Sequence, residues 1–210
     1  MDWLRLLRLS VKGVRGAIGR SLSRIVRIIF MKLHQQHVVR GVKVVLSDMT
    51  QRPEQALDSI RSALDILQET DPRRFLVVRR HVRHILVWPG SYTAYDAWGG
   101  IHLAARHLSE APAEVLASAF VHEATHLRIA KLGIPYDPEL RGRIEALCVD
   151  EQAAFLRKVS PQGSEWAEQV QAGLKDPWWT ESHRRARVQR SLNDAGLPQW
   201  IEPLLYRRRR

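Results

Sequence analysis

Two histidines lie four residues apart in the segment 112–132, within the sequence His122-Glu123-Ala124-Thr125-His126. Pro112 suits the start of a helix and Gly133 suits its end, so the segment is predicted to form one long helix. Residues four apart share one face of a helix, and two imidazoles on one face can bind a single Zn²⁺. Glu123 projects about 100° away round the helix, where it can reach a metal-bound water rather than the metal.

A third ligand is expected from the next helix, because hydrolytic zinc sites use three protein ligands and leave the fourth position to water. The pair Asp137-Pro138 is typical of a helix start, and this helix is predicted to run to about Val159. Two helices joined by a short turn can pack antiparallel and aim Glu145 back at the histidines. Glu145 follows His126 after 18 intervening residues.

Other side chains on this second helix leave alternatives open. Asp150 and Glu151 compete with Glu145 as the ligand, but they lie well round the helix, so at most one of the three faces the site. Asp150 can instead orient a ligand histidine from outside the ligand set. Cys148 lies one turn beyond Glu145 on about the same face. It is either a small buried hydrophobic residue or a thiolate that blocks the metal.

The pattern His122-Glu123-x-x-His126, followed by Glu145, resembles the gluzincin group of zinc metallopeptidases. The resemblance covers residues 84–159 and includes two predicted strands, at 84–88 and 101–104, before the helix. In that group a small sheet precedes the active-site helix, and its edge strand pairs with the extended substrate backbone. The chain departs from the thermolysin-like branch at Val149, where that branch has a carboxylate.

The resemblance implies a role for each site residue. Zn²⁺, one per chain, is held by His122, His126 and Glu145, and Glu123 acts as the general base that passes a proton to the leaving amine. Tyr136 and His183 are the two candidates for stabilising the oxyanion. The alternatives are an aromatic packed on the helix pair for Tyr136 and a solvated side chain for His183.

The charge of +11 is concentrated at the two ends of the chain. Residues 1–40 carry nine Lys and Arg against one acid and the tail 207–210 is four arginines, which leaves residues 41–206 with a net charge of −1. A basic groove that reads nucleic-acid sequence is therefore not expected. Residues 1–33 have apolar positions every three or four residues with Arg and Lys between them, typical of a basic amphipathic helix that lies on an anionic membrane surface or packs on a partner.

The predicted fold class is α+β: a mostly helical zincin-like domain at 41–206, with a small sheet before the active-site helix. A basic amphipathic helical segment at 1–40 and a basic tail at 207–210 flank it. Cys148 is the one cysteine, and no apolar run has the length of a membrane span or of a secretory signal. The sequence thus predicts a cytoplasmic protein that can dock peripherally on a membrane.

The function that this pattern favours is zinc-dependent hydrolysis of peptide bonds in a peptide or protein substrate. The alternative is a non-catalytic adaptor at a membrane surface or on nucleic acid, with a structural or accidental histidine pair. Basic ends can bind phosphate without sequence specificity, so tethering of the same peptidase to DNA also stays open.

Overall fold

A computed structural model describes residues 34–47, 50, 52–88, 93–95 and 99–175, together with isolated positions between 180 and 193. The described strands are β1 (Gln35–Val39), β2 (Val42–Leu46), β3 (His84–Trp88), β4 (Ala94–Tyr95) and β5 (Gly100–Ala104). The α-helices are α2 (Pro53–Thr70), α3 (Pro72–His81), α4 (Ala105–Glu110), α5 (Ala113–Lys131), α6 (Pro138–Val159) and α7 (Gly163–Ala172), and a 3₁₀ turn follows at Gly173–Lys175. The helix predicted for residues 1–33 and the tail at 207–210 lie outside the described residues.

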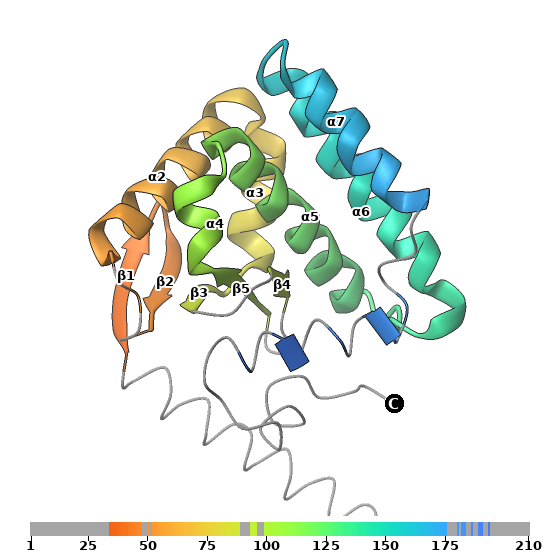
Figure 1. The fold of residues 1–210 in the computed structure, drawn as a ribbon, viewed down its shortest axis with the longest axis horizontal. Helices are drawn as coiled ribbons and strands as arrows, with labels where there is room; N and C mark the ends of the chain where they lie inside the picture. The colour runs from red at the N-terminus through yellow and green to blue at the C-terminus, as the bar shows by residue number, and fades with distance from the viewer. Residues whose placement is uncertain are drawn as a thin grey trace, which may run out of the picture. The chain divides into compact units, whose positions relative to one another are not determined.

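The described strands form one sheet in the order β1-β2-β3-β5-β4 (Figure 1). Arg40 and Gly41 both have positive φ and form the two-residue turn of the β1–β2 hairpin. Strands β2, β3 and β5 pair in parallel, whereas β4 pairs antiparallel with β5 and lies at the edge of the sheet. All residues of β3 and β5 are buried, as expected for strands inside a sheet covered by helices.

One apolar core joins this sheet to the helices. The apolar positions of α2 repeat every three or four residues and are buried, with Ile60 and Leu64 fully so. They share a core cluster with Ile85 and Ile101 of the sheet and with Phe120 of α5. Helix α5 is therefore fixed by packing on both the sheet and α2, and its remaining surface is available to α6.

Helices α5 and α6 form an antiparallel pair whose ends are set by local sequence. The left-handed backbone of Gly133, with φ 80°, follows the end of α5. The carboxylate of Asp137 accepts a hydrogen bond from Leu140 N at 3.1 Å and caps α6. Helix α6 packs against α5 on one side and against α7 on the other (Figure 1). Gly163, at the start of α7, lets this helix approach α6 closely, because an added Cβ would lie 1.8 Å from the carbonyl oxygen of Leu156 on α6.

The α+β class is confirmed, and so are the strands predicted at 84–88 and 101–104 and the helices predicted at 112–132 and 137–159. Residues 35–39 differ from the prediction, because they form β1 instead of the end of the N-terminal helical segment. Strand β4 was not predicted, because its two residues carry too little periodicity to indicate a strand. Among the described helices, none has both the length and the apolar character required to cross a membrane.

Candidate metal centre

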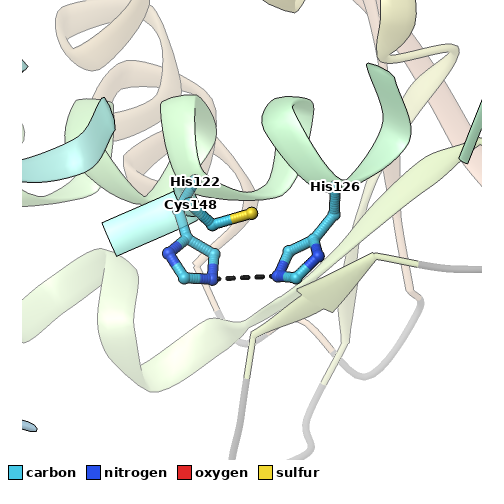
Figure 2. A group of neighbouring side chains, drawn as sticks. All are labelled: His122, His126 and Cys148. Atoms are coloured by element: carbon cyan, nitrogen blue, oxygen red, sulfur yellow. Dashed lines mark hydrogen bonds between the residues drawn. The ribbon is translucent and has the colours of Figure 1, made fainter. Parts of the chain in front are cut away.

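The histidine pair lies on the face of α5 that turns away from the apolar core. His122 Nε2 and His126 Nε2 are 3.1 Å apart, and both rings leave the same face of the helix, as Figure 2 shows. Their exposed fractions are 8% and 4%, so the site is largely closed to water. The spacing of four residues thus brings one nitrogen from each of the two rings to the same point, as the sequence predicted.

Helix α6 supplies a carboxylate at the same point. Glu145 Oε2 lies 3.5 Å from His122 Nε2, and Glu145 Oε1 lies 3.5 Å from His126 Nε2. Glu145 is 2% exposed, and its Oε2 makes no hydrogen bond with any described residue. A buried carboxylate oxygen without a hydrogen-bond donor is costly, and a bound cation would remove that cost.

The spacing of these donors fits a tetrahedral zinc ion. Bonds of about 2.0–2.1 Å to nitrogen or oxygen place tetrahedral ligands about 3.3 Å apart. The two histidine nitrogens are 3.1 Å apart, and each lies 3.5 Å from one of the two Glu145 carboxylate oxygens, Oε2 for His122 and Oε1 for His126, so each distance is close to that value. The chemistry and the approximate spacing of these residues therefore fit the ion that the sequence predicts.

The electrostatics of the cluster also favour a cation. Burial by itself raises the pKa of the Glu145 carboxyl, but the attraction of the two imidazoles outweighs burial and holds that pKa well below its usual range. For His122, burial lowers the pKa, but Glu145 and the charge of Glu123 raise it above the usual value. Two carboxylates thus place negative charge around a histidine pair inside a dry site, which is the charge distribution that a divalent cation neutralises.

Gln152 holds the ring of His122 from outside the ligand set. Its Oε1 lies 3.1 Å from His122 Nδ1, and its Nε2 donates to Ser118 Oγ at 3.1 Å. A proton on Nδ1 leaves the lone pair on Nε2, the atom that faces Glu145 and His126. Gln152 therefore sets the ring orientation and the tautomer that metal binding requires.

The suggestion that Asp150 orients a histidine is wrong. Asp150 is exposed and accepts a hydrogen bond from Gln171 on α7 at 3.4 Å. Glu151, the other competing carboxylate, pairs with Arg74 at 2.7 Å and with Arg128 at 3.7 Å. Glu145 is thus the carboxylate of the three that faces the histidines. Gln152 could have been found from the sequence, because it lies seven residues after Glu145 and so on the same helical face.

Aromatic side chains enclose His126. Tyr95 of β4 stacks on its ring, with centroids 4.7 Å apart and an angle of 21° between the planes. Tyr136, in the link between α5 and α6, packs edge-on against the same ring at 5.6 Å, and its hydroxyl donates a short hydrogen bond to Glu145 Oε1. Tyr136 therefore reaches the cluster, and its role as an oxyanion donor stays a prediction. No signal in the sequence linked Tyr95 to the site.

Glu123 and His183 occupy different environments. Glu123 is 8% exposed, next to His122 on α5, and its charge acts on the ring of His122. His183 is exposed and its Nδ1 lies 3.0 Å from Thr180 Oγ1, as in the alternative of a solvated side chain. The structure therefore gives no support to His183 as an oxyanion donor.

Cys148 completes the surroundings of the histidine pair. The ligand atoms of His122, His126 and Cys148 all lie within 4.8 Å of one another, and all three residues are buried (Figure 2). Burial raises the pKa of the Cys148 thiol, and the nearby charges of Glu145 and Glu123 raise it further. Cys148 also packs with Ile129 and Ile144 in a small core between α5 and α6. This cluster could hold a metal ion.

Comparison of the chain with protein-family models, with curated proteins and with solved structures found no match. The interpretation of the site therefore depends on its own geometry.

Proposed function

We propose that the chain is a zinc-dependent peptidase of gluzincin type. The observation that carries this proposal is the convergence of His122, His126 and Glu145 at spacings that suit tetrahedral zinc. Chance placement of two histidines does not account for a buried carboxylate from another helix at the same point. Glu123, beside them on α5, supplies the further acid–base group that hydrolysis needs.

Each residue of the proposed site has a separate task. Bound Zn²⁺ would supply Lewis acidity that polarises a carbonyl and acidifies water. Glu123 accepts the proton of the attacking water and donates it to the leaving amine. Gln152 keeps Nε2 of His122 available, and the dry surroundings strengthen the charges that act on the substrate.

Tyr136 has two possible tasks that an experiment can separate. Its hydroxyl donates to Glu145 Oε1, which supports a role in positioning that carboxylate. The role of oxyanion donor, implied by the resemblance, stays a prediction. Loss of the hydroxyl in the first case weakens metal binding, and in the second case lowers kcat with metal affinity unchanged.

The edge of the sheet supports a peptide as substrate. Strand β4 is the antiparallel edge strand, it contacts α5, and its Tyr95 stacks on His126. An extended peptide that pairs along β4 would be brought beside the histidine pair. We propose this edge as the binding surface for the substrate backbone.

The compartment and the surface partner are part of the same proposal. We propose a cytoplasmic protein that docks on anionic membranes through residues 1–33, because their cations flank an apolar stripe. Full-length protein should sediment with phosphatidylserine vesicles, and it should bind duplex DNA weakly at physiological salt. Binding to duplex DNA without binding to vesicles would refute the membrane assignment.

The test of the peptidase is metal content together with hydrolysis of a defined probe. Freshly purified protein should contain about one zinc per chain by elemental analysis, and it should cleave fluorescein-labelled casein. Glu123→Gln should keep the zinc and lose the cleavage, whereas Glu145→Ala should lose most of the zinc. Unchanged cleavage in Glu123→Gln would remove the proposed general base. Absence of zinc after reconstitution would leave the adaptor as the remaining function.

A further inference from the structure

Cys148 lies beside the histidine pair, within reach of both ligand nitrogens. It is fully buried on α6, one turn after Glu145, and its sulfur lies within 4.8 Å of the ligand nitrogens of both histidines. Figure 2 shows the Cys148 side chain beside the two rings. A small apolar residue would fill the contact with Ile129 and Ile144 equally well, but it would offer the cluster no donor.

The distances allow the sulfur to bind the same ion. Zinc bonds of about 2.3 Å to sulfur and about 2.0–2.1 Å to nitrogen put tetrahedral N and S ligands about 3.6 Å apart. The sulfur is at most 4.8 Å from either nitrogen, so a movement of about 1 Å brings it into range. Glu145 Oε2, buried and without a hydrogen bond, points to a cation at this place independently of the cysteine.

We propose that Cys148 is a ligand of the metal held by His122, His126 and Glu145, so that the resting centre is closed by sulfur. The S–H bond breaks as the S–metal bond forms, and the proton leaves to solvent, with no change in oxidation state. Four protein ligands are typical of structural zinc sites, and an open position is typical of catalytic ones. The inference rests on the proposed function and adds that bound Cys148 slows cleavage, so that the wild type cleaves only in the fraction of molecules whose sulfur has withdrawn.

A latent centre has a consequence that a structural cysteine does not share. Cys148→Ser removes the sulfur ligand and opens the fourth position to water. Cleavage of labelled casein should therefore be faster in Cys148→Ser than in the wild type. A cysteine that only fills the core would give equal or slower cleavage in the variant, because substitution could only loosen the packing.

Cobalt substitution tests the ligand directly, without reference to activity. Full-length protein is stripped of metal under reducing, anaerobic conditions, loaded with one equivalent of Co²⁺, and its absorption spectrum is recorded. An intense sulfur-to-cobalt charge-transfer band in the near ultraviolet is expected in the wild type. Cys148 is the only cysteine, so this band reports one residue and the wild-type spectrum suffices even if a variant fails to fold.

The outcomes separate this inference from the proposed function. Stoichiometric Co²⁺ with the band in the wild type, and without it in Cys148→Ser, supports the inference. Stoichiometric Co²⁺ without the band overturns the inference and leaves the three-ligand peptidase site standing. Failure to bind Co²⁺ or Zn²⁺ overturns both.

Discussion

Replacement of Gln152 by alanine tests how the site holds His122. The change removes the 3.1 Å hydrogen bond to His122 Nδ1 and the bond that Gln152 donates to Ser118. The ring then loses the partner that fixes its tautomer and orientation. Loss of such a partner typically weakens metal binding by about 10- to 100-fold, or about 1.4–2.7 kcal/mol. We expect the zinc dissociation constant of Gln152→Ala to rise within this range.

The assay is competition for zinc between the protein and a chromogenic chelator at fixed pH, with circular dichroism to confirm folding. Asp150→Asn is the matched control, because Asp150 lies two residues away on the same helix, is exposed, and bonds to Gln171 instead. This control should bind zinc as the wild type does. A dissociation constant within about twofold of the wild type in Gln152→Ala would refute the argument, since loss of an orienting partner should cost at least about tenfold.

Three further predictions concern stability, acid sensitivity and the tyrosine. Gly163→Ala should lower the free energy of unfolding, measured in urea, by about 2–3 kcal/mol, because the added Cβ would lie 1.8 Å from the backbone oxygen of Leu156. Gly173→Ala, where nothing lies within 4 Å of the added Cβ, should be neutral within about 0.5 kcal/mol, and equal losses would contradict the packing argument. Burial raises the pKa of the Asp71 carboxyl, but its hydrogen bonds to Lys158 and Arg74 outweigh burial and hold that pKa below its usual value. The ionised carboxylate therefore stabilises the fold above about pH 4, and this stabilisation is lost as the pH falls through the lowered pKa. Asp71→Asn should therefore be less stable than the wild type at pH 7 and lose less stability in acid, and parallel pH profiles would refute this. Tyr136→Phe should weaken zinc binding about tenfold by releasing Glu145, and unchanged affinity with lowered kcat would favour the oxyanion role instead.

Local rules in the sequence determined the elements that carry the site. Helical geometry alone places His122 and His126 on one face, wherever the helix packs. The cap at Asp137 and the left-handed turn at Gly133 act within a few residues, so the start of α6 and the end of α5 could be predicted. In each case the cause operates between residues close together in the chain.

The tertiary structure decided which side chains meet this pair. The spacing of seven residues puts Gln152 on the same face of α6 as Glu145, but the burial of Ile144, Cys148 and Leu156 turns that face toward α5, so that Gln152 and not Asp150 bonds to His122. Tyr95 reaches His126 because β4 pairs with β5 at the sheet edge beside α5, a contact across about 30 residues of chain. Such contacts depend on packing summed over the whole core, and no short window of sequence contains that information. The sequence thus determined the ligand face of α5, and the packing of α6 and β4 determined what surrounds it.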